Sequence, residues 1–120
     1  QPKFLFEYGQ CLSKTGQYEE GIRILTEGTR LSADPMFYNI MGKDAEALKH
    51  FGQAEACFKQ ASYMVPHRLY PLYLLAKMYF ESGQPEKGRD MARQVIQKAP
   101  KVMSDAVKEM KAELEERLKP

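Results

Sequence analysis

Apolar residues return at the three- and four-residue spacing of α-helices in seven short segments of this chain. Between them lie clusters of turn-forming residues. We predict helices over 3–14, 18–31, 36–48, 52–64, 69–82, 86–98 and 102–118. In the helices over 3–14, 36–48 and 69–82, the inner side is predicted to carry Leu5, Tyr8, Leu12, Tyr38, Met41, Leu72, Leu75 and Tyr79.

Glycine and proline mark where these helices end. Gly16 and Gly83 follow helical segments, and glycine after a helix end readily adopts the left-handed conformation that closes it. Lys49-His50 occupies the corresponding place in the middle of the chain without glycine, so that turn is expected to be slightly strained or differently shaped. Proline also disfavours helical geometry in the residue before it, which predicts helix ends before Pro35, Pro66 and Pro100.

A longer period is superimposed on the helical one. The series Gly42, Ala54, Phe58, Ala61 and Pro66 recurs 34 residues later as Ala76, Gly88, Ala92, Val95 and Pro100, and 33 residues earlier as Gly9, Gly21, Leu25, Gly28 and Ala33. Such a period is typical of stacked helix-turn-helix units. We predict three repeats over about 2–34, 35–68 and 69–100, followed by a capping helix over about 102–118.

Small residues are expected where the two helices of a pair approach closely. In each helix pair, a small residue of the first helix is predicted to face a small residue of the second: Gly9 faces Gly21, Gly42 faces Ala54, and Ala76 faces Gly88. Phe58 is predicted to be a large buried side chain. Glycine at 21 and 88 lowers helix propensity by about 1 kcal/mol each, so we expect the second repeat to be the most stable.

The last helix has a different pattern. Its predicted apolar stripe consists of Val102, Met103, Ala106, Val107, Met110, Leu114 and Leu118. We expect this stripe to cover the third repeat. A membrane-surface helix should carry a basic excess, whereas acidic and basic residues are balanced here.

Composition and charge exclude several classes of function. The chain has 120 residues and a formal net charge of +2 with interspersed signs, which argues against a nucleic-acid interface. Cys11 and Cys57 lack metal-ligand spacing and are expected to be two buried thiols, while His50 and His67 are expected at the surface. Since no phosphate loop, metal motif or catalytic triad is visible, we predict a non-catalytic chain without cofactor or metal, and no segment that inserts into a membrane.

With this periodicity and these small and aromatic positions, the sequence resembles the tetratricopeptide repeat family. The resemblance implies an all-α, right-handed superhelix that binds a protein or peptide on the concave surface formed by the first helix of each pair. Carried over by position, exposed groove residues would include Lys3, Ser13, Met36, Glu46 and Glu81, and the predicted partner-binding residues are Phe6, Gln10, Asn39, Lys43, Tyr70, Tyr73, Lys77 and Phe80.

Members of this family that hold the terminal carboxylate of heat-shock chaperones need lysine, arginine and asparagine at set groove positions. Several of those positions here carry Phe6, Ile40, Tyr70 and Leu74. We therefore do not expect carboxylate-clamp binding. Aromatic side chains near Lys43 and Lys77 are instead expected to receive an extended peptide or a partner helix, although some of these rings could pack against the chain itself.

Two stretches carry a more specific resemblance. Residues 31–42 and 63–79 look like the C-terminal repeat region of O-antigen ligase or polymerase-like membrane proteins of Bacteroidetes-type bacteria. This implies a domain attached to the inner membrane through its parent protein, on an unassigned side. Because the chain begins at Gln1 without a signal-peptide pattern, we expect a piece of a longer protein.

We predict a scaffold for protein interaction, with two alternatives. One is a stand-alone adaptor. The other is a module that forms homo-oligomers through its first helix, which carries Phe4, Leu5, Phe6 and Tyr8.

Overall fold

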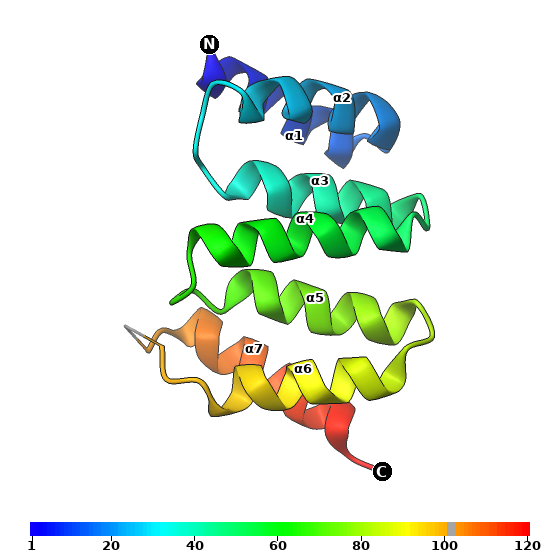
Figure 1. Cartoon of the computed structure of the whole chain (residues 1–120), viewed down its shortest axis with the longest axis vertical. Helices are drawn as coiled ribbons and strands as arrows, with labels where there is room; N and C mark the ends of the chain where they lie inside the picture. Colours follow the sequence, from blue (N-terminus) through cyan, green and yellow to red (C-terminus); the bar gives the residue numbers. More distant parts are fainter. Residues whose placement is uncertain (101–102) are drawn as a thin grey trace.

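The computed structural model describes residues 1–100 and 103–120 and confirms the all-α helical repeat fold. Its seven helices follow one another as a ladder (Figure 1), and the described residues contain no strand. The predicted ranges agree with the observed ones to within two residues, except at the start of the last helix. The helices are α1 (Pro2–Lys14), α2 (Tyr18–Thr29), α3 (Met36–Ala47), α4 (Phe51–Met64), α5 (Tyr70–Glu81), α6 (Pro85–Gln97) and α7 (Asp105–Leu118).

The stack curves toward one side. Helices α1, α3 and α5 contact one another in order, and α7 contacts α5. The backbones of the intervening helices α2, α4 and α6, all within the described range 1–100, do not come within 8 Å of one another between Cα atoms. Because one row of helices is closer together than the other, the surface formed by α1, α3, α5 and α7 is concave. We call this surface the groove face.

Small residues do permit close packing within each pair, but their partners differ from the predicted ones. A Cβ atom on Gly9 would lie 2.5 Å from Leu25, and one on Gly42 would lie 2.5 Å from Phe58. Each glycine therefore faces a large side chain on the second helix, and Phe58 is completely buried, as predicted. Gly21 does approach Gly9, since its Cβ would lie 3.5 Å from the Gly9 carbonyl oxygen.

The three turns inside the helix pairs have the same shape. The backbone N–H groups of Gln17, His50 and Gln84 each donate to the carbonyl oxygen five residues earlier, all at 2.8 Å. This bond closes a helix only when the residue before it has a positive φ. Gly16 and Gly83 meet that need without strain, whereas Lys49 has φ 62°. The turn without glycine is strained, as expected, but it is not differently shaped.

The last helix begins at Asp105, three residues later than predicted. Ser104 is its N-cap, and the Ser104 hydroxyl accepts a hydrogen bond from the backbone N–H of Val107 at 3.2 Å. Such a cap stabilises a helix start. Leu114 is completely buried against α5 and α6, but Met103 and Ala106 are exposed and do not belong to the buried stripe. Val102 lies outside the described residues.

The burial of Tyr8 and of the two cysteines differs in part from the predictions. Tyr8 was expected on the inner side of the first helix, yet it is 41% exposed. Cys57 is buried, and burial together with the nearby Asp44 raises the pKa of its thiol to about 11. Cys11 is exposed, which contradicts the prediction of two buried thiols.

Among the described helices, none combines the length and the apolar character that crossing a membrane requires.

Candidate binding groove

Three hollows follow one another along the groove face, each between two neighbouring helices. The N-terminal hollow, between α1 and α3, has a volume of about 310 Å³ and is lined by Gln10, Ser13, Lys14, Tyr18, Ile40, Lys43, Asp44 and Ala47. The middle hollow, between α3 and α5, has about 330 Å³ and is lined by Lys43, Glu46, Ala47, Leu74 and Lys77. The C-terminal hollow, between α5 and α7, has about 430 Å³ and is lined by Arg68, Tyr70, Tyr73, Ala106, Glu109, Met110 and Glu113.

The N-terminal hollow combines a buried carboxylate with exposed lysines. Asp44 is 1% exposed, and its Oδ2 accepts a hydrogen bond from the Ser13 hydroxyl at 2.8 Å. Burial raises the pKa of Asp44 to about 6, although the hydrogen bond from Ser13 and the charge of Lys43 oppose that rise. Lys14 and Lys43 are exposed at this hollow, and neither forms an ion pair or hydrogen bond with any described residue.

The middle hollow carries charges of both signs. Lys43 and Lys77 line it from neighbouring repeats, together with the half-buried Glu46. Burial and the nearby Glu81 raise the pKa of Glu46, and the two lysines act in the opposite direction. This part of the groove face therefore offers hydrogen-bond donors and acceptors within a short span.

At the C-terminal hollow, Tyr73 and Glu113 are already paired with each other, and Glu113 is also paired with Lys77. The Tyr73 hydroxyl donates to Glu113 Oε1 at 2.7 Å, and Lys77 Nζ lies 3.0 Å from Glu113 Oε2. The hydrogen bond from Tyr73 lowers the pKa of Glu113, with a further contribution from Lys77. Tyr70 stacks beside Tyr73, with ring centroids 6.1 Å apart. A helix of the chain itself thus lines the groove at this end and pairs with its polar residues.

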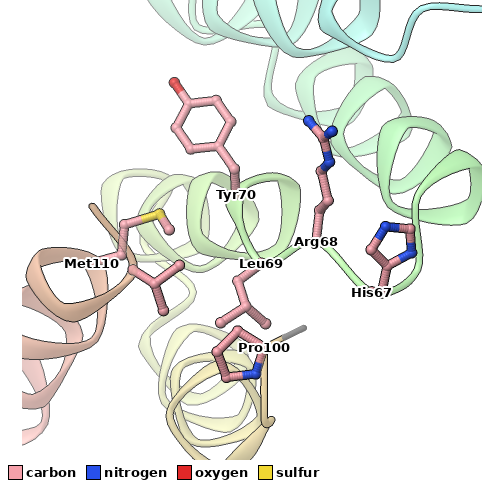
Figure 2. A pocket seen from close by; sticks show the side chains of 7 residues that line it. His67, Arg68, Leu69, Tyr70, Pro100 and Met110 are labelled. Atoms are coloured by element: carbon pink, nitrogen blue, oxygen red, sulfur yellow. The ribbon is translucent and has the colours of Figure 1, made fainter. Parts of the chain in front are cut away.

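A fourth cavity, of about 410 Å³, adjoins the C-terminal hollow at the edge of the stack. Figure 2 shows Arg68 and Tyr70 extending on one side of Leu69, with Met110 contributed by α7 and Pro100 below. His67 lies at the rim beside Arg68. The cavity extends the apolar lining of the C-terminal hollow rather than adding a cluster of reactive groups.

The structure places five of the eight predicted partner-binding residues at the hollows, and these are Gln10, Lys43, Tyr70, Tyr73 and Lys77. The other three have different surroundings, and each is held by its own chain. Asn39 was expected to be exposed but is 2% exposed, and its Oδ1 atom has no hydrogen-bond partner among the described residues.

The remaining two predicted residues are aromatic. Phe6 packs edge-on against Phe37, with ring centroids 5.2 Å apart. Phe80 lies under the guanidinium group of Arg117 at 4.6 Å and borders Gly88, where a Cβ would come within 3.0 Å of its ring. The expectation that some rings pack against the chain itself is confirmed at these two positions.

Sequence reasoning missed Asp44, Lys14, Tyr18 and the contribution of α7. A signal for Asp44 was present, because its equivalents in the neighbouring repeats are Cys11 and Met78. Met78 is completely buried. A carboxylate at a position that is apolar in another repeat departs from the core pattern, and such departures often mark functional sites.

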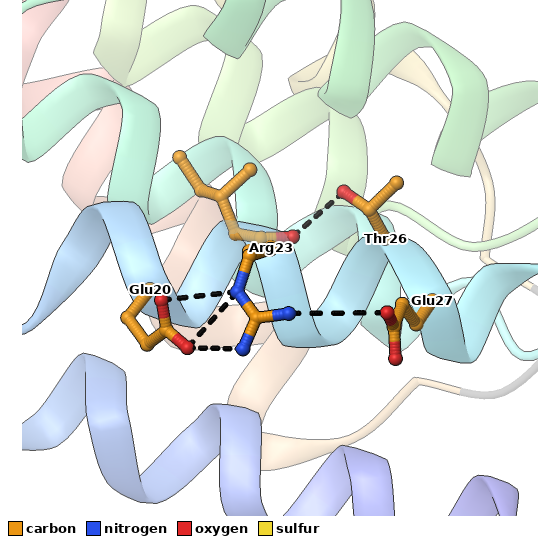
Figure 3. A network of polar contacts seen from close by, with 5 residues as sticks. Glu20, Arg23, Thr26 and Glu27 are labelled. Atoms are coloured by element: carbon orange, nitrogen blue, oxygen red, sulfur yellow. Dashed lines mark hydrogen bonds and ion pairs between the residues drawn. The ribbon is translucent and has the colours of Figure 1, made fainter.

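A second polar cluster lies on α2 and does not line these hollows. In Figure 3 the Arg23 guanidinium bridges Glu20 and Glu27, and the Thr26 hydroxyl donates to the Ile22 carbonyl oxygen at 2.6 Å. The hydrogen bond from Arg23 lowers the pKa of Glu20. All three charged side chains are more than 40% exposed, so this cluster is a solvated helix surface.

Comparison with known protein families gives matches at both ends of the chain. Two family models, each described as tetratricopeptide repeat, match residues 2–35 and 72–101, which together make up more than half of the chain. The chain contains tetratricopeptide repeats at these two segments. A comparison with the sequences of curated proteins found no match.

Solved structures agree with the tetratricopeptide repeat fold. The chain is similar over 98% of its length to a chain of the CopN-Scc3 complex (TM-score 0.85, 14% identity, 69% of that chain). It is also similar over 98% to the first TPR of Spaghetti (RPAP3) bound to the HSP90 peptide SRMEEVD (0.77, 18%, 95%). A third similar structure, again over 98%, is PcrH in complex with the chaperone binding region of PopB (0.76, 14%, 94%). At these identities the likeness concerns the fold.

Proposed function

We propose that this tetratricopeptide repeat domain is a non-catalytic interaction module that binds a peptide or helix of a partner protein on its groove face. The observation that carries this proposal is the row of hollows along α1, α3 and α5, which is open from Gln10 to Lys77. Similar folds are seen with peptide or protein partners, including an HSP90 peptide and a segment of PopB. The groove position of the site supports a binding role.

The groove lysines without an ion pair among the described residues, Lys14 and Lys43, line the N-terminal and middle hollows. Lys43 and Ala47 line both, while in the C-terminal hollow Glu113 of α7 is paired with Tyr73 and Lys77. The positions at which other members of the family hold a terminal carboxylate carry Phe6, Ile40, Tyr70 and Leu74 here. We therefore propose that the partner contacts the domain through an internal segment rather than through its C-terminus.

Ala47 offers a direct test, because this exposed side chain can be enlarged without disturbing the core. Peptides would be selected from a random 12-residue phage-displayed library on the immobilised domain. We expect Ala47→Trp to abolish binding of the selected peptides. The matched control is Ala56→Trp, also exposed but on α4, which does not border the hollows. Failure to select peptides, or equal binding to both variants, would contradict the proposal.

Self-association is a second candidate, favoured by one observation. Phe4 is 64% exposed and Tyr8 is 41% exposed, and their ring centroids lie 6.0 Å apart on α1. Exposed aromatic pairs often belong to protein interfaces. Sedimentation equilibrium under reducing conditions should then show a concentration-dependent mass that Phe4→Ser reduces. A constant monomer mass would leave the groove as the interaction surface.

We also propose that the domain is part of a membrane protein of the O-antigen ligase or polymerase type, attached in that way to the bacterial inner membrane. This proposal depends on the resemblance of residues 31–42 and 63–79 alone, since the matches described above concern the repeats. The complete coding region should then encode about ten or more apolar spans of roughly 20 residues upstream of Gln1. A soluble upstream region would favour a stand-alone adaptor instead.

A further inference from the structure

The contact between α7 and α5 shows how the groove face holds a carboxylate. Glu113 of α7 lies 3.0 Å from Lys77 Nζ and accepts a hydrogen bond from the Tyr73 hydroxyl. Burial lowers the pKa of Lys77, but its hydrogen bonds with Tyr73 and Glu113 outweigh this effect and raise it. A groove lysine is therefore suited to an acidic side chain presented by a helix that packs alongside it.

Lys43 is the equivalent of Lys77 one repeat earlier, because the two residues are 34 positions apart in a 34-residue period. Lys43 lines both the N-terminal and the middle hollow, and it is exposed and without an ion pair among the described residues. Lys14 lines the same N-terminal hollow, also unpaired, with the donor groups of Gln10 and Tyr18 close by. Glu113 forms an ion pair with Lys77, whereas Lys43 forms none with a described residue, although its charge acts on the nearby Asp44 and Glu46.

We propose that the N-terminal hollow receives the carboxylate of a glutamate or aspartate side chain from the partner peptide, with Lys43 and Lys14 as its charged contacts. This inference deepens the proposed peptide-binding function and depends on it. The occupant is an acidic peptide segment because the two unpaired lysines give the rim of this hollow a positive charge, and an acidic ligand complements that charge.

Asp44 is the one acidic residue that lines this hollow, and it must be weighed against the lysines. Its side chain is buried rather than at the rim, and its Oδ2 faces Ser13 of α1 and Gly21 of α2. Cys57, which faces Asp44 from α4, has a raised pKa and is uncharged at neutral pH. Two exposed cations against one buried carboxylate leave the lining of this hollow with a net positive charge even when Asp44 is ionised.

The test compares the composition of selected peptides, and not only whether they bind. The random 12-residue library is selected in parallel on the parent domain and on Lys43→Glu. We expect peptides from the parent to be enriched in Asp and Glu, and peptides from Lys43→Glu to lose that enrichment. Acidic peptides selected on the parent should bind Lys43→Glu about tenfold more weakly, and the difference should shrink with added salt. Lys14→Gln is expected to weaken them by a smaller factor.

Lys87→Glu is the matched control, since it makes the same charge change on α6, away from the hollows. This variant should keep both the enrichment and the affinity. The inference would be overturned, and the proposed function left intact, by selected peptides whose binding is abolished by Ala47→Trp but which show no acidic enrichment or are enriched in Lys and Arg. Equal binding to Lys43→Glu would overturn it as well. Failure to select any groove-dependent peptide would overturn the proposed function, and this inference with it.

Discussion

The two ends of the groove face are built from equivalent positions but are in different states. At the C-terminal end, Lys77 and Tyr73 are paired with Glu113, and the completely buried Leu114 fixes α7 against the third repeat. At the N-terminal end, Lys43 occupies the equivalent position and has no partner among the described residues. The same repeat position is thus satisfied within the chain at one end and available at the other.

This difference indicates how a short repeat array limits where a partner can bind. The array must cover the apolar side of its last repeat, and α7 does so while its Glu113 side chain also fills part of the groove. The N-terminal hollow stays open and contains Asp44, a buried carboxylate whose ionised form is poorly compensated. Sites that bind partners are commonly less stable than the rest of a fold.

The largest expected effect comes from Phe58, which lies between the two ends and packs against Leu74 and Leu75 of α5. Phe58→Ala removes a completely buried ring that sits over Gly42, and it should lower the free energy of unfolding by about 3–5 kcal/mol. Urea unfolding measures this. Tyr63→Ala is the control on the same helix, because Tyr63 is 70% exposed, and it should cost less than about 1 kcal/mol. Similar losses in both variants would refute the assigned repeat register.

Leu114→Ala should make the two ends more alike. The substitution removes the buried contact that holds α7, at a cost of about 2–4 kcal/mol in the free energy of unfolding. Hydrogen exchange should show lost protection in α7, whereas α1 to α4 keep theirs, since the repeats stack as neighbours. The exposed Glu115→Ala variant should leave the exchange pattern unchanged. Uniform loss of protection over all helices would mean that α7 is not a separable cap.

Asp44→Asn tests whether the open end carries a cost. Burial raises the pKa of Asp44 from 3.8 to about 6, so the folded state binds a proton more tightly than the unfolded state does. Ionised Asp44 therefore destabilises the fold progressively from about pH 4 to 6 and by a constant amount above that range, corresponding to about 2–3 kcal/mol. Asn lacks this penalty and can still accept the hydrogen bond from Ser13. The variant should be more stable than the parent at pH 7.5 and equal to it at pH 3.5.

Denaturant unfolding from pH 3.5 to 8 measures this difference. Asp90→Asn is the control, because Asp90 is 75% exposed in its pair with Arg93 and should change stability by less than about 0.5 kcal/mol at every pH. If Asp44→Asn is no more stable than the parent at pH 7.5, the N-terminal hollow carries no electrostatic penalty, and the contrast between the two ends is confined to the lysines.

Most of the fold could be predicted from the sequence because the same residue pattern occurs in three repeats. Gly42 and Phe58 have counterparts one repeat away on both sides, so an error at one repeat is corrected by the others. The start of α7 lacks such counterparts, and its position is decided by a single hydrogen bond to Ser104. Local capping of this kind competes with apolar periodicity, which alone had placed the start at residue 102.

The groove could be predicted less completely, since repeat position indicates which helix face a residue occupies but not what covers it. Lys43 and Lys77 share one position, yet Lys77 is paired by a residue 36 positions later in the chain. Asn39 and Tyr73 also share a position, but Asn39 is buried and Tyr73 is half-buried at the hollow. Contacts from α7 and differences in side-chain size decide these outcomes, and neither follows from the period.

The smallest expected change in stability comes from Glu113→Gln, which acts directly on the contrast between Lys77 and Lys43. Glutamine can still accept the hydrogen bond from Tyr73 but cannot form the ion pair, so the pKa of Lys77 should fall relative to the parent. The free energy of unfolding should change by less than about 1 kcal/mol, because both partners of the pair are about 40% exposed. NMR titration of the lysine side chains measures the change in the pKa of Lys77.

Glu116→Gln is the control. It unpairs the more exposed Lys119 and should leave the pKa of Lys77 unchanged. Lys77 in the Glu113→Gln variant should then resemble Lys43 and bind acidic peptides selected on the parent at a second, weaker site. An unchanged pKa at Lys77 would mean that Glu113 does not neutralise it, and that the two ends of the groove differ in shape alone.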